Sequence, residues 1–417
     1  MLCRLFAFVS ALLVYSTATA QIPNYLVFDK ELSQSFGAEN GITLHKFLYE
    51  KTDEFIPLRL NEENTFWKKS GGIGYRLLKA SVLDLQVNWM FTVVQREAFG
   101  HGSRFREFGY SANYYNFYLI PPLGRGGSYA IEGTLAPNKM TTLPEISAMH
   151  FGGNEANLVL SDRLSSRAIL EGDMHYQESI LYLMTKNNLL FYLWNDRLLS
   201  DFVTLDGDVD SYILNLNRFY SNANGKEYST DKLSLQSLVS LLNPMQIYSV
   251  VSLAKDYLLD GNARGKKIPS INFSKFNYLP SMGYNLTPFG SEFILTNYFF
   301  TDEQSLQVNL NYGDQTFFDF YSAGAKAFNL FPRQKLYVGA EMQIWSQPEL
   351  QLEEWTLTQN EAQLGGLVRA DVSYFPFKES KDFGLFAQVG YKTKGYVLGE
   401  RLDEGLLLQF GISLKGK

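Results

Sequence analysis

The chain has 417 residues, of which 26 are Tyr, 32 are Phe and one is Cys, and its formal net charge at pH 7 is −6. The mean hydropathy of −0.14 is too low for a protein built from membrane-spanning helices. The heavy aromatic load is instead typical of an outer-membrane β-barrel, in which only alternate residues of each strand contact lipid. The sequence has no run of basic residues, which argues against nucleic acid as a partner.

The first twenty residues, 1–20, are predicted to be a signal peptide. Arg4 supplies the charged start, Leu5–Tyr15 forms the apolar run, and small residues precede the expected cleavage after Ala20. The protein is therefore expected to leave the cytoplasm. The one cysteine, Cys3, lies in the signal peptide, so we expect the mature chain to have no disulfide and no cysteine metal ligand.

The segment 21–74 is expected to be extended, and Asn24–Lys30 is a candidate strand. From Tyr75 to Gly109 apolar residues recur at a spacing near 3.6, which predicts a helix. Most helical stretches carry internal charged or amide residues, so none is expected to be a clean spanning segment. We expect 75–270 to form a packed helical domain. Its further predicted helices are Glu155–Leu170, Gln177–Thr204 and Leu233–Leu259.

One constellation within the predicted helices could carry chemistry. Glu97 and His101 are four residues apart on a predicted helix and therefore lie on one face of it. A glutamate and a histidine that face the same way are components of a zinc hydrolase. In such a site the imidazole binds the metal, and the carboxylate takes a proton from the metal-bound water.

The residues around this pair resemble the His-Glu-x-x-His helix of site-2-protease-type membrane metalloproteases. Phe151–Leu160 resembles the Gly-Pro-x-x-Asn helix start of that family, and Leu242-Asn243-Pro244 is similar to its Asn-Pro motif. The resemblance covers about Val93–Pro244, which is less than half of the chain. It implies that Glu97 is the general base and that His101 is a metal ligand.

The sequence departs from the family pattern at the positions that matter for zinc. Arg96 stands where the first histidine should be, and a guanidinium cannot ligate Zn²⁺. One residue more than the family spacing separates Glu97 from His101. No acidic third ligand stands beside Asn243-Pro244. We therefore predict a catalytically degenerate domain, that is, a pseudoenzyme.

Other residues could complete a zinc site around His101, and the candidates are His150, Glu155 and His175. The alternative is structural: Glu97 would pair with a neighbouring arginine, Arg96, Arg104 or Arg106, on a polar helix face.

Further along the chain, Asp206, Asp208 and Asp210 have the spacing of the first ligands of a calcium loop. The loop glycine and the distal glutamate are missing, so a solvated turn and helix cap is the preferred interpretation.

The last third of the chain alternates apolar with polar residues, which predicts strands with one apolar face. The clearest example is Lys335–Trp345. The apolar positions of that segment are Leu336, Val338, Ala340, Met342 and Ile344. In Leu367–Phe375 the opposite face carries Arg369 and Asp371. Seven strands are expected, at 289–300, 304–313, 315–327, 333–346, 361–376, 382–397 and 404–415.

These patterns predict an α+β fold, in which 280–417 form a C-terminal antiparallel β-barrel or partial barrel of about seven or eight strands. The helical domain lies N-terminal to it. A soluble β-sandwich is the alternative, but strand lengths near the ~9–11 residues needed to cross a bilayer favour the barrel. An open edge is not tolerated in lipid. We therefore expect the sheet to be sealed by a strand from Asn24–Lys30 or Gly127–Pro137, by helices, or by a partner chain.

The expected location is the outer membrane of a Gram-negative bacterium, in contact with its lipid. The expected role is that of a structural or accessory subunit of an outer-membrane assembly or export complex, with protein partners. No cofactor is expected, and Zn is the metal that the candidate site could bind. A zinc-dependent membrane hydrolase that uses Glu97 and His101 is one alternative, and a small-solute channel lined by polar strand faces is another.

Overall fold

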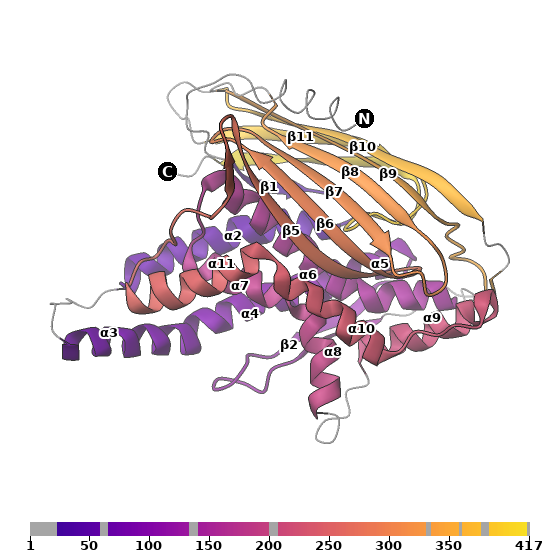
Figure 1. The fold of residues 1–417 in the computed structure, drawn as a ribbon, viewed down its shortest axis with the longest axis horizontal. Helices are drawn as coiled ribbons and strands as arrows, with labels where there is room; N and C mark the ends of the chain where they lie inside the picture. The colour runs from indigo at the N-terminus through magenta and orange to yellow at the C-terminus, as the bar shows by residue number, and fades with distance from the viewer. Residues whose placement is uncertain are drawn as a thin grey trace.

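A computed structural model describes residues 23–58, 66–132, 141–199, 207–330, 335–357, 361–376 and 383–414. The predicted signal peptide, 1–20, lies outside the described residues. The chain has the predicted α+β fold, with a large antiparallel sheet in its C-terminal part and helices N-terminal to it. Figure 1 shows the helices gathered against one face of the sheet.

The helical part contains one long helix that begins at Phe66 and ends at Glu107. Its consecutive elements are α3 (Phe66–Lys79), η1 (Ala80–Asp84), α4 (Leu85–Val94), η2 (Gln95–His101) and α5 (Gly102–Glu107), and both η1 and η2 are π-helical. The other described helices are α2 (Gln34–Phe55), α6 (Leu143–Glu171), α7 (Tyr176–Lys186), α8 (Asn188–Leu199), α9 (Asp208–Asn224), α10 (Thr230–Ser237), η3 (Leu238–Leu242), α11 (Pro244–Val251) and η4 (Ser252–Leu259). The four predicted helical stretches are mostly helical where they are described, with breaks at Asn187 and Asn243. The helices α2 and α9 were not predicted, and α2 lies in the segment 21–74 that was expected to be extended.

The long helix buries polar residues and turns apolar ones outward. Lys79, Asp84 and Glu97 are buried, whereas Trp89 and Met90 of the same helix are partly exposed. Within Lys69–Glu107 an 18-residue window reaches a mean hydropathy of 1.2, and a third of it (33 %) is buried. By length and composition alone, this helix could therefore cross a membrane, which the sequence patterns did not predict.

Local sequence sets both ends of α6, which packs against α2, η2, α7 and α9. Thr142 caps its start: the Thr142 hydroxyl accepts from the Glu145 amide, and the Glu145 carboxylate accepts from the Thr142 amide. Gly172 ends the helix in the left-handed region, at φ 87°.

The sheet has ten strands in the order β1-β12-β11-β10-β9-β8-β7-β6-β5-β4, all paired antiparallel. The seven predicted strands are confirmed as β6 (Gly290–Phe300), β7 (Ser305–Gly313), β8 (Tyr321–Phe328), β9 (Leu336–Pro348), β10 (Ala362–Tyr374), β11 (Phe383–Lys392) and β12 (Gly405–Leu414). The strands β4 (Ile271–Phe273) and β5 (Phe276–Thr287) were not predicted. A separate two-stranded sheet pairs β2 (Ala112–Phe117) with β3 (Ser128–Glu132).

The N-terminal strand β1 (Asn24–Phe28) comes from the first of the two segments considered for an extra strand, and it pairs with β12 in the register Asn24↔Leu414. The second such segment, Gly127–Pro137, contributes β3 instead, and its last residues lie outside the described ones. The segment 21–74 also contains α2 and the start of α3.

The sheet is not closed into a barrel, because β1 and β4 are its two edges among the described strands. The closed form of the predicted barrel is therefore wrong, and ten strands replace the seven or eight expected. Helices lie next to both edges. Helix α2 packs against β1, and α10, η3 and α11 pack against β5.

The two faces of the sheet differ in polarity. On the face toward the helices, buried Arg369 binds Glu341 (Nε to Oε2, 2.9 Å) and Glu400 (Nη1 to Oε1, 2.5 Å). The opposite face, which we call the outer face, presents the apolar side chains of the predicted alternation. Those more than half exposed on β9 to β12 are Met342, Ile344, Leu364, Val368, Leu385, Val389, Leu406, Leu408 and Phe410.

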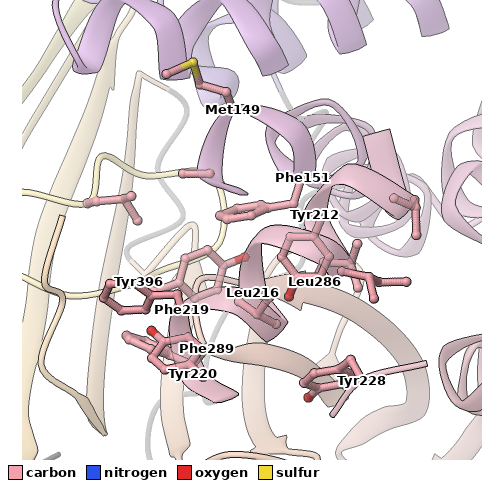
Figure 2. Close-up of a cluster of buried hydrophobic side chains, with 14 of the residues drawn as sticks. Met149, Phe151, Tyr212, Leu216, Phe219, Tyr220, Tyr228, Leu286, Phe289 and Tyr396 are labelled. Carbon is pink, nitrogen blue, oxygen red and sulfur yellow. The ribbon is translucent and has the colours of Figure 1, made fainter. Parts of the chain in front are cut away.

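The main core lies between α6, α9 and the turn that joins β5 to β6. Figure 2 shows Phe151 of α6 beside Tyr212 of α9 and Tyr396 of the loop after β11, and its ring centroid is 6.0 Å from each of theirs. Leu286 and Phe289, from the β5–β6 turn region, are fully buried in the same cluster. This core holds α9 against α6 and so positions the start of α9.

Candidate functional site

The candidate site lies where η2 crosses α6, and glycines allow the two backbones to touch. A Cβ on Gly100 would lie 2.7 Å from the Gly152 carbonyl oxygen and 2.7 Å from Gly153 Cα. A Cβ on Gly153 would lie 2.4 Å from Nε2 of His101. The His101 ring therefore rests on the bare backbone of α6, a placement that a larger residue at 153 would prevent.

Asp208, at the first turn of α9, is the centre of the site. Its Oδ2 lies 3.3 Å from Nε2 of His101, and its Oδ1 lies 3.1 Å from Nδ1 of His150. The Arg96 guanidinium binds both Asp208 and Glu97. Ser128 of β3 donates to Glu97 at 2.8 Å. The site therefore joins residues from η2, α6, α9 and the β2–β3 hairpin.

Charges in the site balance. Nδ1 of His101 donates to the Met149 carbonyl at 2.6 Å, and its Nε2 faces the Asp208 carboxylate, an arrangement that suits the doubly protonated ring. Burial by itself raises the pKa of Asp208, but the nearby cations His101 and Arg96 outweigh burial and hold this pKa well below its ordinary value of 3.8. Two cations therefore face two carboxylates, those of Glu97 and Asp208.

This arrangement leaves little capacity for zinc chemistry. Arg96 lies between the two carboxylates, where a bound cation would have to be, and it cannot act as a ligand. Glu97 accepts hydrogen bonds from both Arg96 and Ser128, so its Oε1 is already engaged within the protein. Within the described ranges, no group of three or more His, Cys, Asp or Glu side chains could hold a metal ion. The pairing of Glu97 with Arg96 is the structural alternative that the sequence left open.

The structure brings two of the candidate ligands, His101 and His150, to the same carboxylate and places Glu155 elsewhere. Glu155 of α6 is fully buried and binds Arg104 through both oxygens, at 2.8 and 2.7 Å. It also accepts from the side chain of Gln34 and from the amide of Gly399.

The remaining candidate, His175, lies at the start of α7 in a different polar network. Its Nε2 is 2.9 Å from Asp53 Oδ2, and its ring stacks on that of Tyr49 with the centroids 4.0 Å apart. Asp53 also approaches Lys79, which in turn binds Asp84 at 3.0 Å. The candidate ligands therefore occupy three separate networks.

Asp208 is the member of the site that sequence reasoning missed. Its carboxylate was interpreted as part of a solvated turn, because no local motif links residue 208 to the pair at 97 and 101. The available signal was an acidic residue at the start of an unpredicted helix, where the helix dipole favours negative charge.

Asn243, from the third motif of the resemblance, has a structural role. Its Oδ1 accepts from the Met245 amide at 2.9 Å and so caps α11. Its Nδ2 donates to the Met282 carbonyl oxygen and to the Ser281 hydroxyl on β5, each at 2.8 Å. This residue therefore connects a helix start to the sheet and lies apart from the carboxylate cluster.

Comparisons with protein-family models, curated proteins and solved structures find no match to the chain. Arguments about function therefore start from the residues and contacts described above.

Proposed function

We propose that the protein is an integral protein of the outer membrane, in which the outer face of the sheet is a partial barrel wall in contact with lipid. The helices behind the sheet would act as a scaffold that serves a membrane assembly or export complex. The observation that carries the proposal is the outer face itself, whose large side chains on β9 to β12 are apolar and exposed.

The dimensions and the extent of this face support the proposal. The strands β9 and β10 have 13 residues each, and β11 and β12 have 10 each, compared with the ~9–11 that a tilted strand needs to cross a bilayer. Soluble monomers rarely expose a contiguous apolar patch beyond roughly 300–600 Å². An apolar face that continues across several neighbouring strands is better matched by hydrocarbon than by water.

The inner side of the sheet favours a scaffold over a channel. Helices pack on it, and its charged residues pair with one another, as Arg369 does with Glu341 and Glu400. Polar contacts also join it to the helices: Asp162 of α6 accepts hydrogen bonds from Tyr298 and Gln307, at 3.3 and 3.4 Å. A polar lumen for solutes would require these groups to face water.

Site-directed spin labelling would test the location of the sheet. In a Cys3→Ser background, which removes the one cysteine, single cysteines would replace Val368 on the outer face and Glu353 in the loop between β9 and β10. The labelled proteins would be reconstituted in phospholipid vesicles and exposed to oxygen or to a water-soluble nickel complex. We expect the label at 368 to meet oxygen and exclude nickel, and the label at 353 to do the reverse. A label at 368 that is open to nickel would contradict the proposal.

The zinc hydrolase is tested separately by the metal content of the purified protein and of its His101→Ala variant. The ion pairs of Arg96 lead us to expect far less than one zinc per chain in both proteins. Near-stoichiometric zinc that is lost on His101→Ala would instead favour the enzyme.

A further inference from the structure

We propose that the helices α10, η3, α11 and η4, spanning Thr230–Leu259, form a broken membrane segment that contacts lipid and seals the β5 edge of the sheet. The proposal rests on the proposed location of the outer face in a bilayer, and it adds a helical part to that lipid-facing surface. Its occupant is the acyl-chain region of the same bilayer.

The helix pair has the polarity of a lipid-facing segment. From Leu235 to Ala254 every exposed residue is apolar: Leu235, Leu241, Leu242, Ile247, Val250, Val251 and Ala254. The buried residues of the same stretch include many polar ones: Ser237, Ser240, Asn243, Gln246, Ser249 and Ser252. A surface helix in water shows the opposite arrangement, with its apolar stripe toward the core. Turning small polar residues inward and aliphatic ones outward is favourable where the surroundings are hydrocarbon.

The helix pair and the neighbouring α9 each donate a hydrogen bond to a backbone carbonyl of β5. The short strand β4 pairs with β5 only from Phe276 to Tyr278, so the rest of β5 has no described strand on that side. There, Asn243 donates to the Met282 carbonyl oxygen at 2.8 Å. Tyr212 of the neighbouring α9 donates to the carbonyl oxygen of Thr287 at 2.8 Å. Unpaired backbone groups are too costly in hydrocarbon for an open edge to face lipid. These two donors each bond to a carbonyl group of β5 and so lower that cost.

The bend in the pair has a local cause. The two arms, Thr230–Leu242 and Pro244–Leu259, meet at 65°, and together they pass as one broken span by length and composition. Pro244 cannot continue the helix before it, and Asn243 caps the helix after it. Neither arm alone reaches the ~20 residues of a straight transmembrane helix. At the bend, the polar side chain of Asn243 turns to β5 and away from the surface.

The other edge of the sheet is sealed in the same way by α2. The Asn40 side chain matches both backbone groups of Val27 on β1: its Oδ1 accepts at 3.0 Å and its Nδ2 donates at 3.1 Å. Thr43 donates to the Tyr25 carbonyl oxygen at 2.6 Å. The exposed residues of α2 beside this contact are apolar: Leu44, Phe47 and Leu48. Helices therefore bond to backbone groups at both edges of the sheet, where a further strand is missing.

Spin labels on the helix pair would test this inference with the same two relaxation agents. In the Cys3→Ser background, single cysteines would replace Ile247 and Val251 on the apolar face. Lys255 is the first exposed charged residue after the apolar run Leu235–Ala254, where the helix is expected to leave the hydrocarbon, and it is the matched water-facing control. Val368 on the sheet is the reference for lipid contact. Far-ultraviolet circular dichroism would show that each labelled variant keeps the fold of its parent.

We expect the labels at 247 and 251 to behave like the label at 368, with high oxygen and low nickel accessibility, and the label at 255 to be open to nickel. Nickel access at 247 and 251 with lipid contact at 368 would overturn the edge-sealing helices and leave the proposed location of the sheet intact. Labels at 247 and 251 that neither agent reaches would also overturn the inference, because protein would then cover this face. Nickel access at 368 as well would overturn both proposals.

Discussion

At the scale of single residues, Asp208 is the carboxylate that joins three helices. It connects α9 to His101 on η2 and to His150 on α6, and it shares Arg96 with Glu97. Arg96, Glu97 and His101 are buried, while the side chains of Asp208 and His150 are about a quarter to a third exposed. Breaking a buried ion pair leaves an uncompensated charge, so the network is expected to be sensitive to loss of any one member.

Replacing Asp208 by Asn keeps the shape of the side chain and removes its charge. Arg96 and His101 would then share the single carboxylate of Glu97 in a buried position. We expect the variant to unfold more easily by about 3 kcal/mol, at the low end for a buried pair because Asp208 is partly exposed. Chemical denaturation in detergent would measure the change. Asp210→Asn, on the exposed side of the same helix turn, is the control, and an equal loss in both variants would contradict the role of the network.

The pH dependence of stability follows from the lowered pKa of Asp208. A carboxyl group with a lower pKa in the folded chain stabilises it fully above the ordinary value of about 3.8, and this contribution is lost as the pH falls toward the folded pKa. We expect the free energy of unfolding to decrease as the pH is lowered from about 5 to 2, less steeply in Asp208→Asn than in the wild type. Denaturation at a series of pH values would show this. Identical slopes would mean that another carboxyl group dominates.

At the scale of elements, the crossing of η2 and α6 depends on Gly100. A Cβ at this position would lie 2.7 Å from the backbone of α6, which has no flexible side-chain end that could move aside. We expect Gly100→Ala to destabilise the protein by about 1–3 kcal/mol, because the helices must separate and the overpacked contact strains them.

Gly41→Ala is the matched control for this substitution. Gly41 lies in α2, and no atom lies within 4 Å of an added Cβ there. We expect this change to stabilise the protein by about 0.5–1 kcal/mol, through the better helix propensity of alanine. Thermal unfolding of both variants would compare them. A Gly100→Ala variant as stable as Gly41→Ala would show that the helices do not need the close approach.

The strands with the clearest predicted alternation, β9 to β12, have one exposed face. In β9 to β12 polar and apolar residues alternate with a period of two, because one face of these strands meets helices and the other is exposed. In β5 the pattern is lost: Pro280 and Gly283 interrupt it, and from Tyr284 to Thr287 every residue is buried. A strand covered on both faces carries no alternation to detect.

The candidate site was predicted in part, because a local sequence pattern can place neighbouring residues but not residues that are distant along the chain. Helical spacing was enough to place Glu97 and His101 together, and their side chains come within 4.0 Å of each other. It could not show that η2 is π-helical, with wider turns, or that Arg96 would point into the same cluster. The partner that completes the network, Asp208, is more than a hundred residues away along the chain. Only the packing of α9 on α6 brings it to the site.

At the scale of the whole molecule, buried pairs of charged residues accompany an exposed apolar face of the sheet. Charged side chains such as Lys79, Glu155 and Arg369 are buried and paired, and large apolar ones cover the outer face of the sheet. Lys, Glu and Arg are seldom fully buried in soluble proteins unless they are paired. In a bilayer, close contact of small residues and internal polar bonds hold helices together, since the hydrophobic effect does not act between them. The glycines at the η2–α6 crossing suit that mode of packing.

The sheet and the helices are therefore expected to fold as one unit. Strand β12 pairs with β1 from the N-terminal end of the chain, and the polar residues of β6 and β7 bond to Asp162 of α6. A fragment of residues 271–417 would leave these groups unpaired and both sheet edges open, so we expect it to aggregate. Co-expression with residues 21–270, each fragment carrying the predicted signal peptide, should restore a protease-resistant complex in the membrane fraction. A 271–417 fragment that becomes protease-resistant by itself would show that the strands close without the helices.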